Sequence, residues 1–161
     1  MKKLKIYLDT SVVSYLDQPD RQERYRETHA FWEKLKAGAY ELVMSDVTFR
    51  ELYRCEDEKK NRLLKLLAEV TFITVSEDEA VVSLASKLIE FGILPQKCFD
   101  DCLHIAYAVT TDCDAIVSWN FKHIVNHKTI VGVKAIASLE GYHDLMIYTP
   151  AYLLGGENDD P

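Results

Sequence analysis

Short β-prone runs alternate with longer amphipathic stretches along this chain, and few architectures accommodate that alternation. Residues 5–8, 40–44, 70–75 and 115–118 are rich in apolar, β-branched and aromatic side chains and have the length of strands. The stretches between them carry apolar residues at helical spacing. Strands separated by helices predict an α/β domain with a mostly parallel sheet and helices on both faces.

The helical stretches have recognisable beginnings and ends. Residues 22–37 form an amphipathic pattern that stops near a glycine, and Ser45 is the expected N-cap of the next helix, which runs to about residue 55. Ser76 and Glu79 form a capping-box pattern. Residues 130–133 are expected to begin a short further element. Additional helices are expected over residues 58–69, 76–92 and 100–109.

Length and hydropathy point to one domain in the cytoplasm. The 161 residues suit a single compact domain, and no apolar run approaches the roughly 18 residues that a membrane span requires. The N-terminus is basic, but its apolar stretch is only a few residues long and ends at Asp9, unlike a signal peptide. We expect residues 1–150 to form the domain and residues 151–161 a flexible acidic tail.

The net charge of −7 argues against a basic surface that grips nucleic acid through many phosphate contacts. It does not exclude a nuclease, because acids that bind Mg²⁺ present less negative charge to a substrate. The four cysteines, at 55, 98, 102 and 113, have irregular spacings and no secretion signal accompanies them. We therefore expect reduced thiols and, in the absence of matching Cys or His pairs, no zinc site.

Three acidic residues lie at the ends of strands or in the helices that follow them. Asp9 follows the first strand, Glu51 lies in the helix after the second, and Asp101 lies in the first turn of its helix. Each position has a structural explanation alone: a cap, a solvated face and the helix dipole. Since ligands bind at the carboxyl edge of a parallel sheet, we expect the three side chains to converge there. Carboxylates so gathered favour Mg²⁺ or Mn²⁺, which can activate water for attack on a phosphodiester.

Four segments around these residues resemble PIN domains, in the same order and at fitting separations. They are residues 6–12, 45–52, 101–108 and 116–124, and residues 147–150 resemble the terminal strand of the same family. The pattern is similar to the bacterial subgroup of VapC-like toxins of type II toxin–antitoxin pairs. The resemblance implies a Rossmann-like three-layer sandwich, Mg²⁺- or Mn²⁺-dependent ribonuclease activity, homodimers and often a cognate antitoxin.

The resemblance also implies roles for individual residues. Asp9, Glu51 and Asp101 match three acidic positions of the family and are the expected catalytic residues and metal ligands. A fourth acid would stand where this chain has Asn120 or His123, so Asn120 is a further candidate ligand through its carbonyl oxygen.

Supporting roles are assigned to three residues near these positions: Thr10, His104 and His123. Thr10 either binds a metal-ligated water or caps the first helix. His104 lies on the helical face of Asp101, where it either hydrogen-bonds a catalytic carboxylate or reaches a phosphate, or is a half-buried histidine with a backbone partner. For Ser11, which follows Thr10, we expect a helix-capping role.

Two functions follow from this reading. The first is a metal-dependent endoribonuclease that hydrolyses RNA with metal-activated water and is, or is related to, the toxin of a type II toxin–antitoxin pair. The second is a PIN-fold binding module, catalytically weak or inactive, that dimerises or binds a protein or RNA partner. The first is the main prediction, and the missing fourth acid at Asn120 and His123 and the net charge of −7 are the reasons for keeping the second as the alternative.

Overall fold

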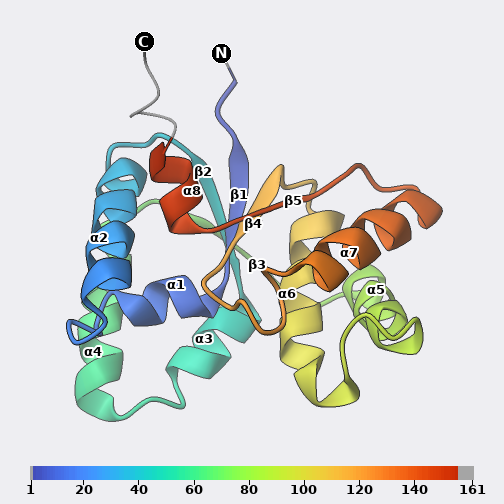
Figure 1. The fold of residues 1–161 in the computed structure, drawn as a ribbon. Helices are drawn as coiled ribbons and strands as arrows, with labels where there is room; N and C mark the ends of the chain where they lie inside the picture. Colours follow the sequence, from blue (N-terminus) through green and yellow to red (C-terminus); the bar gives the residue numbers. More distant parts are fainter. Residues whose placement is uncertain (1, 156–161) are drawn as a thin grey trace.

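A computed structural model describes residues 2–155, and within them a single five-stranded sheet forms the centre of the fold (Figure 1). All neighbouring strands pair in parallel, in the order β3-β2-β1-β4-β5. The strands are β1 (Lys5–Leu8), β2 (Glu41–Ser45), β3 (Ile73–Val75), β4 (Ala115–Val117) and β5 (Met146–Tyr148). The predicted parallel sheet is confirmed.

Helices cover both faces of this sheet, which gives the three layers of the expected α/β sandwich (Figure 1). Helices α1, α2, α4 and α8 lie on one side, and α5, α6 and α7 on the other. The helices are α1 (Thr10–Tyr15), α2 (Gln22–Lys36), α3 (Asp46–Leu52), α4 (Asp57–Leu67), α5 (Glu79–Glu90), α6 (Phe99–Thr110), α7 (His127–Leu139) and α8 (Pro150–Gly155), with a 3-10 turn, η1 (Gln96–Cys98). Among these described helices, none has the length and apolar character needed to cross a membrane.

The strands separate two apolar cores because their side chains alternate between the faces of the sheet. Ile6 and Leu8 of β1 pack into the core beneath α2, whereas Tyr7 packs into the core beneath α6. Both faces are covered, so all three of these side chains are fully buried. This explains why the strands appear in the sequence as continuous apolar runs rather than as alternating patterns.

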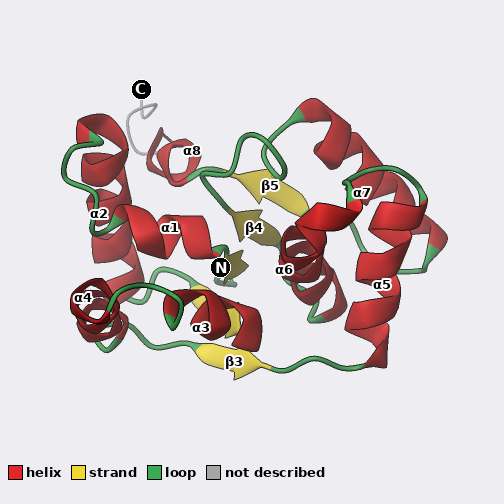
Figure 2. Cartoon of the chain, turned by 90° about the horizontal axis from the view of Figure 1, so that it is seen from below, coloured by secondary structure: helices red, strands yellow, loops and turns green. Residues whose placement is uncertain are grey.

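The strand order reverses beside β1, and this reversal marks the place where parallel sheets bind ligands. The chain runs outward from β1 through β2 to β3, then returns to place β4 on the other side of β1. Leu8 is in register with Val117, so the residues after β1 and β4 emerge side by side. Figure 2 views the molecule from this carboxyl edge, with α1, α3 and α6 around the end of the central strand.

Two of the predicted helix caps were wrong, because the predicted side chain does not bond a helix amide in either case. Ser45 occupies the N-cap position of α3, but its hydroxyl bonds the hydroxyl of Tyr7 at 2.7 Å instead of a helix amide. Helix α5 is capped by Asp78, whose carboxylate accepts from the amide of Val81, so the capping box expected at Ser76 does not form.

The expectations for the C-terminal region also need correction. Residues 130–133 are not a separate short element but the second turn of the 13-residue helix α7, which β-branched residues around Gly132 obscured in the sequence. Residues 151–155, expected to belong to a flexible tail, lie in α8, which packs against α2, and Tyr148 stacks on Tyr152 at 4.5 Å. The remainder of the expected tail, residues 156–161, lies outside the described residues.

Gly132 permits the close approach of α7 to the loop after α5. A Cβ built at this position would lie 2.5 Å from Cγ1 of Ile93, well inside van der Waals contact. We expect Gly132→Ala to lower the free energy of unfolding by about 1–2 kcal/mol, because overpacking outweighs the gain in helix propensity. Urea unfolding measures the change. Gly155→Ala, where a Cβ meets nothing within 4 Å, is the control and should change stability by less than about 0.5 kcal/mol.

Candidate metal and active site

Residues from four segments line one hollow at the carboxyl edge of the sheet. Asp9 follows β1, Glu51 lies in α3, Asp101 in the first turn of α6, and Asn120 in the loop after β4. The hollow has a volume of about 260 Å³, and Thr10, Ser11 and Ser14 complete its lining. The convergence of the three acids expected from the sequence is therefore present in the fold.

Asp9 is buried, with 3% of its surface exposed, and one of its two carboxylate oxygens is fully engaged. Its Oδ2 accepts hydrogen bonds from the hydroxyls of Ser11 at 2.6 Å and Ser118 at 2.7 Å. These hydroxyls accept in turn from the backbone amides of Trp119 and Asn120. The predicted capping role of Ser11 was therefore wrong, because its hydroxyl orients Asp9 instead. The same hydrogen bonds connect the loop after β4 to Asp9.

Glu51 is held by hydrogen bonds from two different helices. Its Oε1 accepts from Thr10 Oγ1 at 3.0 Å and from His104 Nε2 at 2.6 Å. The other ring nitrogen of His104 bonds the Tyr7 hydroxyl at 2.6 Å, and that hydroxyl bonds Ser45. A buried chain of polar groups thus runs from β2 through β1 and α6 to the carboxylate of Glu51.

His104 lies close to two of the three acids. The residue is fully buried, and its Nε2 lies 3.6 Å from Oδ1 of Asp9 as well as 2.6 Å from Glu51. Burial by itself would lower the pKa of His104, but the Glu51 hydrogen bond and the charges of Asp9 and Asp101 outweigh it and raise that pKa. A charged His104 offsets part of the repulsion among the carboxylates in the metal-free protein.

The surroundings of Asp101 favour its protonated form. Burial, the nearby charge of Asp9 and, to a lesser extent, that of Glu51 raise the pKa of Asp101 to about 6, although His104 and His123 oppose the shift. Its neighbour Asp100 points elsewhere and pairs with Arg50 at 2.7 Å, so it neither lines the hollow nor occupies the N-cap of α6.

Asn120 and His123, where a fourth acid was expected, occupy different places. Asn120 lines the hollow, but its Oδ1 already accepts from the backbone amide of His123 at 3.0 Å. His123 does not line the hollow and places its Nδ1 3.1 Å from Oδ2 of Asp101. Asn120 therefore offers one remaining lone pair of its carbonyl oxygen, and His123 approaches the site from the far side of Asp101.

Two residues of the site escaped the sequence reading, Tyr7 and Ser118. Tyr7 lies in the middle of a buried strand, where an aromatic residue ordinarily belongs to the apolar core. Its hydroxyl nevertheless forms a hydrogen bond with His104. Ser118 follows β4 as Asp9 follows β1, and its strand-end position is the signal that could have revealed it.

The lining of the hollow fits a hard divalent cation. It contains three carboxylates and an amide oxygen, the ligands that Mg²⁺ and Mn²⁺ prefer. Oδ2 of Asp9 is held by two serine hydroxyls, which leaves Oδ1 for a ligand. Burial and, after it, the charge of Asp9 raise the pKa of Asp101, and a bound cation would favour its charged form.

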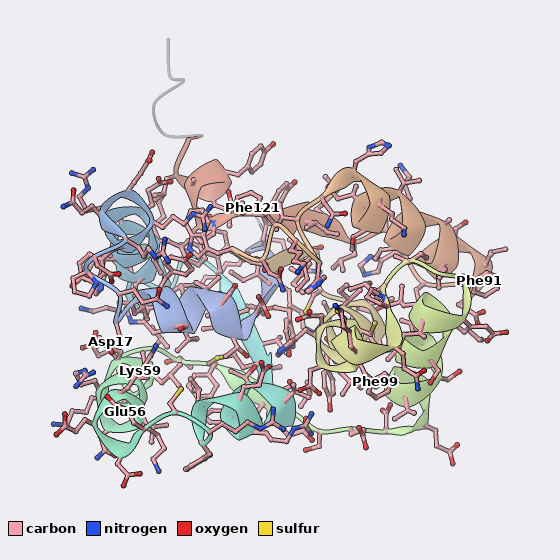
Figure 3. All side chains as sticks on the ribbon, turned by 60° about the horizontal axis from the view of Figure 1, so that its bottom comes forward. Asp17, Glu56, Lys59, Phe91, Phe99 and Phe121 are labelled. Carbon is pink, nitrogen blue, oxygen red and sulfur yellow. The ribbon has the colours of Figure 1, made fainter. Side chains whose placement is uncertain are left out.

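A second hollow of about 270 Å³ adjoins the first along the loop after β4. Its lining includes His123 and two lysines, Lys122 and Lys128, together with Phe121, a residue that is 44% exposed (labelled in Figure 3). The guanidinium of Arg24 lies 4.9 Å from the centre of that ring. This surface is basic and partly aromatic, in contrast to the acidic hollow beside it.

Comparison with known proteins shows which family and which solved structures the chain resembles. The family model described as PIN domain matches residues 6–122. No curated protein matches the sequence significantly. Among solved structures, 15 chains match. One is a chain from the crystal structure of VapBC2 from Rickettsia felis bound to a DNA fragment from their promoter, with a TM-score of 0.54 and 11% identity over 91% of this chain and 98% of that chain.

Proposed function

The chain belongs to the PIN-domain family, and we propose that it is an endoribonuclease that requires Mg²⁺ or Mn²⁺. One observation carries the proposal: Asp9, Glu51 and Asp101 reach the same hollow from three elements that are distant in the sequence. Each acid alone has a structural explanation, but gathering one buried and two partly buried carboxylates in one hollow is costly without a cation.

The three acids and the carbonyl oxygen of Asn120 would hold the cation. When bound, a divalent cation supplies positive charge to the phosphoryl group and lowers the pKa of water. The chain's own groups keep the ligands in place: Ser11 and Ser118 orient Asp9, and Thr10 and His104 orient Glu51. Ligands fixed in this way need little rearrangement when substrate arrives.

The basic hollow provides a path for the substrate beside the acids. Lys122 and Lys128 can contact phosphates, and the exposed ring of Phe121 can stack on an unpaired base. Single-stranded RNA presents both features, since its bases are free to leave the stack. The overall charge of −7 does not prevent binding when the local surface is basic.

The proposal extends to partners as a toxin, or a relative of one, in a type II toxin–antitoxin pair. Its support is the similarity in fold to a protein solved as VapBC2 with promoter DNA. Exposed large apolar side chains at Tyr53, Phe91, Leu139 and Tyr152 are available for an antitoxin or a second copy of the chain. Light scattering on the isolated protein tests the homodimer, and co-purification with the product of an adjacent small reading frame tests the antitoxin.

The nuclease proposal is tested with purified protein, a panel of structured and single-stranded RNAs, and Mn²⁺ or Mg²⁺. We expect cleavage that chelation abolishes, and cation binding in calorimetry. Protein that cleaves no RNA in the panel and binds neither cation contradicts the proposal. Cation binding without cleavage instead favours the alternative of a PIN-fold module that binds a protein or RNA partner.

Asn120→Asp separates a weak nuclease from a binding module. The substitution keeps an oxygen to accept from the His123 amide and gives the hollow a fourth carboxylate. We expect Mn²⁺ affinity to rise by about 10-fold, as an added charged ligand contributes on the order of 1–2 kcal/mol, and RNA cleavage to rise with it. Calorimetry and a fluorescent RNA assay measure the two changes. Tighter Mn²⁺ binding without cleavage in either protein would favour the binding module.

A further inference from the structure

Three potential metal ligands of different chemistry meet on the far side of Asp101 from the acidic hollow. They are Cys98 at the end of η1, Asp101 in α6 and His123 in the loop after β4, and their ligand atoms all lie within 4.8 Å of one another. Cys98 is the N-cap of α6 and Asp101 lies in the first turn of that helix, whereas His123 comes from a segment more than 20 residues further along. In Figure 3, the labelled Phe99 directly follows Cys98 in the sequence, and the labelled Phe121 precedes His123 by two residues.

The backbones of Cys98 and His123 are held in position by hydrogen bonds. The amide of Cys98 bonds the carbonyl of Pro95, and only 6% of the cysteine is exposed. His123 is fixed through its backbone, because its amide donates to Asn120 and its carbonyl accepts from Thr129 at 2.7 Å. Its ring stands 3.1 Å from the Asp101 carboxylate. The ring and carboxylate are therefore already close to the separation of two ligands on one ion.

The ligand types distinguish this cluster from the acidic hollow. Zinc binds thiolate sulfur at about 2.3 Å and imidazole nitrogen or carboxylate oxygen at about 2.0–2.2 Å, so tetrahedral ligands lie about 3.3–3.8 Å apart. The ligand atoms now lie within 4.8 Å of one another, so they would have to approach by no more than about 1.5 Å to reach that spacing. Sulfur and imidazole do not suit Mg²⁺, but they suit Zn²⁺ and Co²⁺.

We propose that Cys98, Asp101 and His123 form a binding site for a zinc-type cation, with one coordination position left for water or a substrate oxygen. A thiolate and a carboxylate each carry one negative charge, so with a neutral imidazole they balance the +2 charge of such an ion. Three protein ligands with a fourth position open is the pattern of catalytic rather than purely structural zinc. The site shares Asp101 with the acidic hollow but needs no nuclease activity to exist.

Cobalt is the probe for this site, because a cysteine thiolate bound to Co²⁺ gives a near-ultraviolet charge-transfer band that carboxylate ligands do not. We expect the full-length protein, kept reduced with a non-thiol reductant, to develop this band on titration with Co²⁺ and to lose it when Zn²⁺ is added. Cys98→Ser should lack the band, and His123→Ala should weaken Co²⁺ binding by more than about 10-fold. Cys55→Ser, a change at a half-exposed cysteine elsewhere, should leave the titration unchanged.

Variants in the two sites separate this inference from the proposed nuclease. Asp9→Asn should weaken Mn²⁺ binding but retain the Co²⁺ band, whereas Asp101→Asn should weaken both. A band in Cys98→Ser, or none in the wild type, overturns the inference whatever the nuclease assays give. Should Cys98→Ser fail to fold by circular dichroism, unchanged Co²⁺ affinity in His123→Ala overturns it equally. A Co²⁺ band in a protein that cleaves no RNA supports this site and counts against the nuclease.

Discussion

Asp9→Asn is expected to reduce Mn²⁺-dependent RNA cleavage by at least about 100-fold while the fold stays intact. An asparagine can place its carbonyl oxygen where Oδ2 accepts from Ser11 and Ser118, so the buried hydrogen bonds survive. The amide nitrogen then replaces Oδ1 and cannot ligate a cation. Loss of a metal ligand removes several kcal/mol of transition-state stabilisation, hence the size of the effect.

The matched control for this variant is Asp46→Asn. Asp46 follows β2 as Asp9 follows β1, but its carboxylate accepts from Tyr107 at 2.6 Å and does not line the hollow. Cleavage rates over a Mn²⁺ titration, with circular dichroism to check folding, give the comparison. Full activity in Asp9→Asn would assign the cleavage to a contaminant or to another site.

Asp101→Asn is expected to make the metal-free protein more stable at neutral pH, by on the order of 2–3 kcal/mol. An unfolded aspartate has a pKa of about 3.9, whereas that of Asp101 in the folded protein is raised to about 6 by burial and by Asp9. Between these pH values the folded state binds the proton more tightly than the unfolded state. The free energy of unfolding therefore falls as pH rises from about 4 to about 6, and stays lower above.

Asparagine is uncharged, so Asp101→Asn should lack this fall, and the two proteins should differ most above pH 6. Urea unfolding in the presence of a chelator, at several pH values, measures the difference. Asp100→Asn is the control, because Asp100 pairs with Arg50 at the surface outside the hollow. Mn²⁺ should raise the stability of the wild type and narrow its gap to Asp101→Asn. The same pH dependence of stability in the wild type and in Asp101→Asn between pH 4 and 6 would contradict the prediction.

The local pattern of apolar residues in the sequence was sufficient to predict the layers of this fold. Strand and helix periods differ, so residues 5–8 and 22–36 could be assigned from spacing alone, and the order of elements required a parallel sheet. Helix α7 was missed because Ile130, Val131 and Gly132 disfavour helix locally, and packing against Ile93 outweighs that preference.

The sequence by itself was enough to predict that Asp9, Glu51 and Asp101 lie together. The order of strands and helices places all three near the carboxyl edge of the sheet, and the family resemblance marks the same positions. The sequence could not determine which groups hold them. His104 beneath Glu51, Ser118 beside Asp9, and Cys98 next to His123 are contacts between segments 20 or more residues apart. Such contacts are set by strand register and by the packing of helices on the sheet. The spacing of cysteines and histidines along the chain argued against a zinc site, because spacing reveals only ligands that are close together in the sequence. Cys98 and His123 are far apart in the sequence, and only the tertiary structure brings them together.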